Sequence, residues 1–330
     1  HDAKFDFEDC NRQRFGCVVG TSKGGFQSFK KSAQQFANHP ANHPDKSFPL
    51  AGLEEFPANR ASVEVATTLN LQGAVLCPVA ACATGLVSLM QGANLIANGY
   101  CDTVLAGSSD ASLQEILLGS YNRMGVLAKN FENPQTACKP FDKTRNGFLV
   151  GEGAAMFLLE EAAFAEARGA TPYAEWVTGH LATDISGLTS LEEDATSLTW
   201  LIQNCLQQAK MSPSEIDYIN LHGTATRLND IYETNALKKA CGRTIYDIPC
   251  SSFKGALGHL LGAAGSVETA FSLLAMRDNI IPPTLNLTTP DPQCDLNYTP
   301  HIASSQTVNS LLKLSFGFGG HLAAAVLRAV

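Results

Sequence analysis

Short apolar segments alternate along the chain with longer segments of helical periodicity. Residues 15–20 and 103–107 are runs of β-branched and small apolar residues, which are typical of strands buried on both faces. Between them, apolar residues recur at helical spacing from 86 to 97, and Gly99 follows as a helix-ending residue. This order predicts a strand, a helix and a second strand.

The same order returns in the second half of the chain. Residues 218–221 are predicted to form a strand, 260–276 a largely apolar helix, and 313–316 and 322–327 two closing strands. Alternation of this kind predicts an α/β fold in which helices pack on mixed sheets.

Other segments carry weaker patterns. Residues 27–56 and 183–197 lack periodicity, so we expect loops there. A helix rich in Ala, Glu and Arg at 160–168 ends at Gly169 and is expected to join two halves of the molecule.

Composition and charge narrow the class of protein. Of 330 residues, 45% are hydrophobic and 16% charged, which is enough to bury a core. The net charge is -8 and no Lys/Arg run is present, so we predict no nucleic-acid partner. The apolar segment 260–276 contains Gly and Glu268 and is shorter than the ~20 residues of a membrane span, so no membrane partner is expected.

The ten cysteines show no CxxC pair and no spacing typical of a zinc site or a secreted disulfide scaffold. We therefore predict no metal site and a reducing, cytoplasmic location. Residue 1 is His and no signal peptide precedes Phe15, so the chain is expected to begin partway through a longer one.

Cys82 is the first candidate for chemistry. It comes directly before the predicted helix 86–97, where the positive end of the helix dipole would lower the pKa of its thiol. The alternative is a small buried hydrophobic residue, which is the usual role of a free cysteine.

Two histidine motifs follow. His222 lies after a predicted strand in His-Gly-Thr-Ala-Thr, which predicts a tight turn with the imidazole in a cleft. Lys254 precedes His259 by five residues at a Gly/Ala-rich helix start. A hydrogen-bonded structural histidine and plain close packing are the alternatives. A late turn, Gly-Phe-Gly-Gly at 317–320, could leave backbone N–H groups free for an anion, or could be a hairpin without function.

Taken in order, these motifs resemble those of the β-ketoacyl synthases, and most closely the elongating branch with two histidines. The resemblance runs from about Gly16 to Val330 and rests on five motifs: Ala-Cys-Ala-Thr-Gly at 81–85, Pro-Phe-Asp-Lys-Thr-Arg-Asn-Gly-Phe at 140–148 with Gly-Glu-Gly at 151–153, His-Gly-Thr-Ala-Thr at 222–226, the segment 254–265, and Gly-Phe-Gly-Gly at 317–320. The family normally has a central strand and a helix before residue 14, and these are missing here. His321 stands where the elongating members usually have Thr.

The resemblance implies a thiolase-like α/β fold with duplicated α-β-α-β-α layers. Its two halves would be residues 1–165, with the nucleophilic cysteine, and 166–330, with the two histidines, in one compact domain. It also implies an acyltransferase that condenses a carrier-bound acyl chain with malonyl-carrier protein, by loss of CO2, in fatty acid or polyketide synthesis. No bound cofactor is expected, since substrates would arrive on the phosphopantetheine of an acyl carrier protein.

The resemblance also assigns roles to residues. Cys82 would accept the acyl chain, His222 and His259 would donate N–H groups to the malonyl thioester oxygen, and Lys254 would support the histidines, paired with Glu268. The backbone N–H groups of Cys82 and Phe318 would surround the acyl oxygen, with Phe318 also acting as a gate. Further assignments are Gly319 beside that gate, Thr224 and Thr226 as support, Phe56, Pro57 and Ala58 at the acyl pocket, and Lys30, Lys31, Arg123 and Lys129 as a carrier-docking patch.

By analogy the protein would form a homodimer through the strand 103–107, or a heterodimer with a related subunit. Two other functions are weighed against the enzyme. A non-catalytic partner subunit, like a chain length factor, need not keep a reactive Cys82. A degradative thiolase would use a second cysteine in a late Cys-x-Gly motif, and none follows Cys294.

Overall fold

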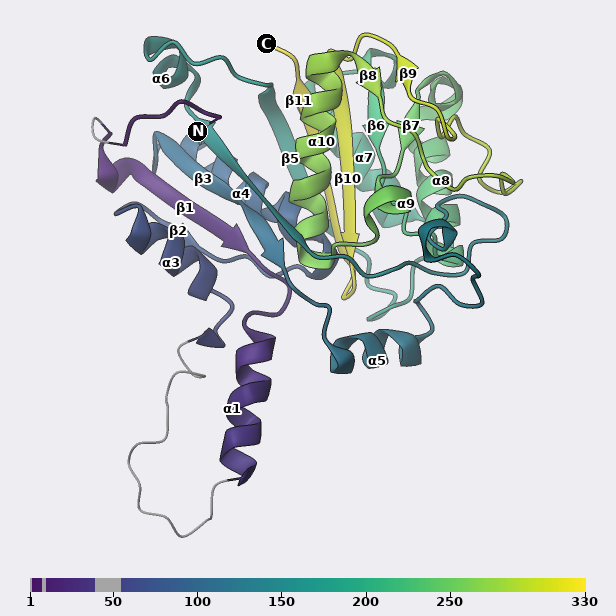
Figure 1. Cartoon of the computed structure of the whole chain (residues 1–330). Helices are drawn as coiled ribbons and strands as arrows, with labels where there is room; N and C mark the ends of the chain where they lie inside the picture. Colours follow the sequence, from purple (N-terminus) through teal and green to yellow (C-terminus); the bar gives the residue numbers. More distant parts are fainter. Residues whose placement is uncertain (1, 8–9, 39–54) are drawn as a thin grey trace.

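The computed structural model describes residues 2–7, 10–38 and 55–330 (Figure 1). Its first sheet has the strand order β2-β1-β3-β4, in which only β4 runs antiparallel to its neighbour. These strands are β1 (Phe15–Gly20), β2 (Val75–Leu76), β3 (Thr103–Asp110) and β4 (Gly153–Glu160). β1 is buried along its whole length, as its β-branched and small residues predict.

The second sheet has the order β5-β11-β10-β6-β7, with β11 antiparallel to both of its neighbours. Its strands are β5 (Glu175–Thr183), β6 (Tyr218–Asn220), β7 (Cys250–Ser251), β10 (Ser310–Gly317) and β11 (His321–Arg328). A separate antiparallel pair joins β8 (Ile280–Ile281) and β9 (Ser304–Ser305).

Two buried helices separate the sheets. They are α4 (Thr84–Ala97) and α10 (Ala264–Asp278), and α10 crosses the front of the molecule in Figure 1. A Cβ on Gly85 would lie 2.3 Å from the Ser266 nitrogen, and one on Gly265 would lie 2.4 Å from the Leu86 nitrogen. Only glycine at both positions lets the two backbones cross this closely.

The outer faces of the sheets are covered by other helices. α3 (Arg60–Thr68) packs on β1 around Phe15 and Val19. α7 (Thr196–Ala209) and α8 (Arg227–Cys241) cover the second sheet over a core that includes Leu198 and Leu312. The layers are therefore α-β-α-β-α, which confirms the predicted thiolase-like fold.

Shorter or peripheral elements complete the chain. α1 (Phe26–Asn38) projects from the body in Figure 1. The others are α5 (Glu115–Met124), α6 (Ala162–Ala167), α9 (Lys254–Leu257) and the 3-10 segments η1 (Arg12–Arg14), η2 (Ala81–Ala83), η3 (Pro134–Thr136), η4 (Pro213–Glu215), η5 (Gly242–Asp247) and η6 (Leu261–Ala263).

Several sequence-based expectations are wrong. The segment 27–56 begins with the helix α1, because residues 27–38 hold good helix formers and neither Gly nor Pro; residues 39–54 lie outside the described part of the chain. The strand 103–107 cannot be a free edge, because β3 pairs with β1 on one side and β4 on the other. Nor is there a gap at the centre of the first sheet, since β1 pairs with both β2 and β3.

Candidate active site

Cys82 lies on the short η2 segment that leads into α4. The residue before it, Ala81, has φ 47°, which turns the chain sharply between β2 and the helix. Thr84 holds this turn with its hydroxyl, which accepts from the Ala80 N–H at 2.9 Å and donates to the Ala81 carbonyl at 2.7 Å. The Cys82 residue is 7% exposed.

The glycine-rich turn between β10 and β11 lies against Cys82. A Cβ on Gly317 would come within 2.9 Å of the Cys82 nitrogen, and the Ser315 hydroxyl donates to the Cys82 carbonyl at 3.3 Å. Gly319 and Gly320 have φ values of 87° and 78°, so the turn depends on glycine. Phe318, at the tip, is half-buried, and its backbone bonds the thiol of Cys82.

Burial raises the pKa of the Cys82 thiol to about 11. The charges of Lys23 and Lys254 and the hydrogen bond from the Phe318 backbone lower that pKa, but burial outweighs them. The expectation of a lowered pKa at a helix start is therefore wrong for the resting protein. Burial of the thiol thus favours its protonated form at neutral pH.

His222 follows β6 and is fixed through its backbone. The N–H groups of His222 and Gly223 donate to the two oxygens of Glu233 at 2.7 and 2.8 Å. Gly223 has φ 38°, and a Cβ there would meet Ser252 at 2.6 Å. Burial raises the pKa of Glu233 to about 7, while the two N–H groups lower it. The hydroxyls of Thr224 and Thr226 lie 2.8 Å apart in the same turn.

His259 is held by backbone bonds to the Gly-Glu-Gly region. Its N–H donates to the Leu149 carbonyl at 2.7 Å, and its own carbonyl accepts from Gly151 at 2.9 Å. The Leu261 N–H donates to His259 Nδ1 at 3.4 Å. Because Nδ1 is an acceptor, the neutral ring carries its proton on Nε2, which makes that atom a donor.

The two imidazole rings form one pair. Their centroids are 5.4 Å apart with an angle of 81° between planes, and both residues are buried. Burial and the charge of Lys254 hold the pKa of each histidine well below its usual value. Both rings are therefore uncharged at neutral pH.

A buried ion cluster supports His222. Lys254 Nζ donates to the His222 carbonyl and to Glu268 Oε1, each at 2.5 Å, so the predicted pairing with Glu268 is present. The second oxygen, Glu268 Oε2, accepts from Lys313 Nζ at 2.6 Å. All three side chains are fully buried. The sequence analysis did not identify Lys313 as a site residue, although a lysine inside an apolar strand pattern indicates a buried charge.

The motifs that are distant in the sequence meet in one apolar cluster. Cys82, Ala225 and Leu261 pack together in it, which joins the cysteine turn to both histidine turns. Cys138 belongs to the same cluster, and burial raises its pKa to about 12.

Asp110 and Lys23 form a second group at this site that sequence analysis did not find. The Asp110 carboxylate accepts from Ser22, from Ser112 and from the Gly262 N–H, the last at 3.1 Å. Lys23 Nζ lies 3.7 Å from the same carboxylate and 5.9 Å from the ring centre of Tyr121. The position of Lys23 in the turn three residues after the end of β1 was the available signal.

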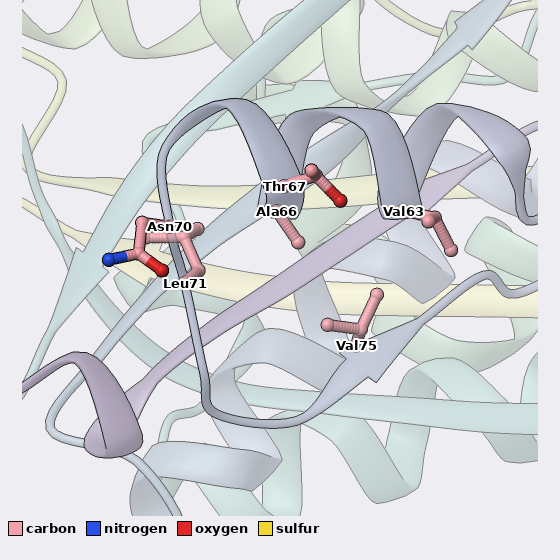
Figure 2. Close-up of a pocket in the computed structure, with 6 residues that line it drawn as sticks. All are labelled: Val63, Ala66, Thr67, Asn70, Leu71 and Val75. Carbon is pink, nitrogen blue, oxygen red and sulfur yellow. The ribbon is translucent and has the colours of Figure 1, made fainter.

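The residues predicted for the acyl pocket lie beside the turn that follows Lys23. The ring centroids of Phe56 and Phe29 are 4.7 Å apart, and the rings are tilted by 36°. The backbone of Phe56 and Ala58 lies close to Gly24, and Pro57 between them is exposed. A pocket near them, between α3 and β2, contains neither Cys82 nor a histidine (Figure 2). It is lined by Val63, Ala66, Thr67, Asn70, Leu71 and Val75.

The predicted docking residues lie at the protein surface. Lys30 and Lys31 are on α1, Arg123 is on α5, and Lys129 follows α5. Lys30 Nζ contacts Glu115 Oε2 at 3.3 Å, which links the two helices.

Among residues 2–7, 10–38 and 55–330, no group of three or more His, Cys, Asp or Glu side chains is placed to hold a metal ion. The same residues include no helix long and apolar enough to span a membrane.

Comparison with known proteins decides the family. Residues 1–165 match the model of the β-ketoacyl synthase N-terminal domain, and residues 173–288 match that of the C-terminal domain. The chain belongs to the β-ketoacyl synthase family. The structure resembles one chain of a solved complex, that of a type II polyketide synthase acyl-carrier protein with its ketosynthase bound to the hexaketide. The TM-score is 0.94 and the identity 33%, over 99% of this chain and 81% of that one.

Curated relatives support the same family. The chain is 35% identical to the tetracenomycin polyketide synthase ketoacyl synthase alpha subunit of Streptomyces glaucescens, over 99% of this chain and 77% of the relative. It is also 35% identical to 3-oxoacyl-[acyl-carrier-protein] synthase 2 of Coxiella burnetii, over 100% of this chain and 78% of the relative. The match to the oxytetracycline polyketide putative beta-ketoacyl synthase 1 of Streptomyces rimosus covers 82% of this chain and 64% of that relative. The predicted family and enzyme class, a β-ketoacyl-[acyl-carrier-protein] synthase, are confirmed, and the partner-subunit alternative is not favoured.

Proposed function

We propose that Cys82 accepts an acyl chain from a carrier-protein thioester and that this β-ketoacyl synthase extends the chain with a malonyl unit. The thiol would attack the acyl carbonyl, and the carrier thiol would leave with the proton. The backbone N–H groups of Cys82 and Phe318 would stabilise the negative oxygen that forms in this step, with Gly319 shaping their turn.

In the second step a malonyl thioester would lose CO2 beside the two histidines. The electron pair left by the broken bond forms an enolate, whose carbon attacks the Cys82 thioester and whose oxygen needs hydrogen-bond donors. The observation that supports this role most directly is the Leu261 N–H on His259 Nδ1, since it leaves Nε2–H as a donor on an uncharged ring. Lys254 and Glu268 would fix His222, and Thr224 and Thr226 would support its turn.

The partners are part of the same proposal. The solved complex of an acyl-carrier protein with its ketosynthase, and that of the ishigamide ketosynthase with a chain length factor, support a carrier partner and a dimer for this chain. Substrates would arrive on phosphopantetheine, and the carrier would dock near Lys30, Lys31, Arg123 and Lys129. Phe56, Pro57 and Ala58 would border the acyl chain. The halves would be 1–165 and 166–330, in a reducing cytoplasmic location where all ten cysteines stay free.

Intact mass spectrometry tests the nucleophile. We expect an acyl-carrier thioester to add one acyl group to the wild-type protein and to Cys77→Ala, a matched variant of another thiol, and none to Cys82→Ala. Malonyl-carrier protein should then release a chain two carbons longer. A folded wild-type protein that takes up no acyl group would overturn the proposal and restore the partner-subunit reading.

A further inference from the structure

Lys313 is a fully buried cation to which the roles above give no part. It lies in the middle of β10, with Ala325 of β11 and Asn220 of β6 as its register partners. Its ammonium group donates to Glu268 Oε2 at 2.6 Å and to the Leu314 carbonyl at 2.9 Å. A buried ammonium is unfavourable unless it is paired, so its presence in this strand calls for a reason.

The pairing leaves one positive charge in excess. Glu268 is a single carboxylate between two cations, and no side chain of the three reaches solvent. Lys254 on the other oxygen reaches the His222 carbonyl at 2.5 Å. Lys313 is thus connected to His222 through Glu268 and Lys254.

The excess charge acts on the histidines. Lys254 and Lys313 both lower the pKa of His222 and the pKa of His259. For Cys82, the main charges that lower its pKa are instead Lys23 and Lys254. The effect of Lys313 is therefore directed to the malonyl side of the site.

The groups that face Lys313 come from several elements. Burial and Lys254 lower the pKa of Lys313, whereas Glu268 and Glu233 raise it. Its titratable and charged neighbours are Glu268 of α10, Lys254 of α9, Glu233 of α8 and the two histidines.

We propose that Lys313 is a positioning residue for decarboxylation: it fixes the Glu268 carboxylate that places Lys254 on His222, and its charge keeps both imidazoles in the uncharged, N–H-donating form. This inference rests on the roles proposed above for His222 and His259. A cation that reaches His222 only through Glu268 and Lys254 is suited to this, because it orients the donors without competing for substrate.

Two half-reactions separate this role from a structural one. The first is conversion of malonyl-carrier protein to acetyl-carrier protein and CO2, in which the enolate takes a proton from solvent. The second is alkylation of Cys82 by iodoacetamide. The variants are Lys313→Met, which removes the charge and fills the space, and Lys313→Gln, which keeps a donor for Glu268. Lys239→Met, at the exposed end of α8, is the control.

We expect Lys313→Met to slow decarboxylation about tenfold, since a charge-assisted bond to the buried carboxylate is lost, and to leave the alkylation rate within about twofold. The acid limb of its decarboxylation profile should move to higher pH, because imidazoles with one fewer cation nearby protonate more readily. Lys313→Gln should keep part of the rate but show the same shift in pH. Lys239→Met should change neither reaction.

Each other result has a distinct meaning. A wild-type protein that fails to decarboxylate malonyl-carrier protein would reject the proposed function itself. If the wild-type protein decarboxylates malonyl-carrier protein, and Lys313→Met does so at the same rate with an unshifted pH profile, only the role of Lys313 is rejected. Equal losses in both half-reactions, or two variants that do not fold, would make Lys313 a core residue and also overturn the inference.

Discussion

The helices α4 and α10 begin in the same way and carry different chemistry. Each follows a 3-10 segment whose first residue has a positive φ, 47° at Ala81 and 51° at Leu261. The next residue is Cys82 in one and Gly262 in the other. The first start presents a thiol, and the second presents backbone N–H groups, from Leu261 to His259 and from Gly262 to Asp110. One backbone arrangement thus carries the proposed nucleophile in one half and hydrogen-bond donors in the other.

The two sheets are also arranged alike. If each sheet is followed from the edge where its strands are parallel, the first has the order β2-β1-β3-β4 and the second β7-β6-β10-β11, with the same strand directions. The second sheet then continues with β5. No described strand lies beyond β4. β10 of the second sheet packs on the start of α4, while β3 of the first packs on the start of α10. Each half therefore supports the reactive turn of the other, which explains why neither could form the site alone.

The largest effect should come from removing a hydrogen-bond donor of the histidine pair. We expect His259→Ala to slow malonyl decarboxylation by about 10³-fold, the loss seen when an oxyanion donor is removed, with little change in alkylation of Cys82. Carbon dioxide release and iodoacetamide labelling measure the two sides separately. His301→Asn, on an exposed loop, is the matched control. Equal losses in the rate of decarboxylation and in the rate of Cys82 alkylation would show that the two helix starts do not have separate roles.

The next effect is on stability at the crossing of the two helices. Gly265→Val would place a side chain against the Leu86 backbone, which cannot move aside, so we expect the free energy of unfolding to fall by about 3 kcal/mol or more. Urea denaturation measures this. Gly119→Ala, in α5 with nothing within 4 Å, should instead be neutral or slightly stabilising. Similar midpoints for both variants would show that the close crossing is not needed.

The smallest effect concerns the charge beside the thiol. Because burial raises the pKa of Cys82 to about 11, the thiolate fraction, and with it the alkylation rate, should rise about tenfold per pH unit from pH 7 to 9. Lys23→Met removes a charge that lowers this pKa, so its rate at pH 8 should be about threefold lower. A wild-type rate that levels off near pH 7 would instead support the lowered pKa that the sequence predicted.

Much of the fold could be predicted from local patterns. The strands β1 and β6, the helix α4 and the closing pair β10 and β11 are set by runs of β-branched or aliphatic residues, by helical spacing and by glycines at the turns. The motifs around Cys82, His222 and His259 also stand out, since small residues must flank a side chain that reaches into a tight site. What failed was α1, although Phe26, Phe29 and Ala33 recur at helical spacing in its sequence, and the position of β3 within its sheet.

The sequence by itself determined most element types and the family, and it predicted the reactive residues, because these depend on neighbours in the chain. Only the tertiary structure decided the protonation of the site. The pKa of Cys82 rises although a helix begins there, and Lys313 joins Glu268 and Lys254 across 59 residues of chain, from 254 to 313. Burial and charge act through space and not along the sequence, so the electrostatics of this site exist only once both halves have packed together.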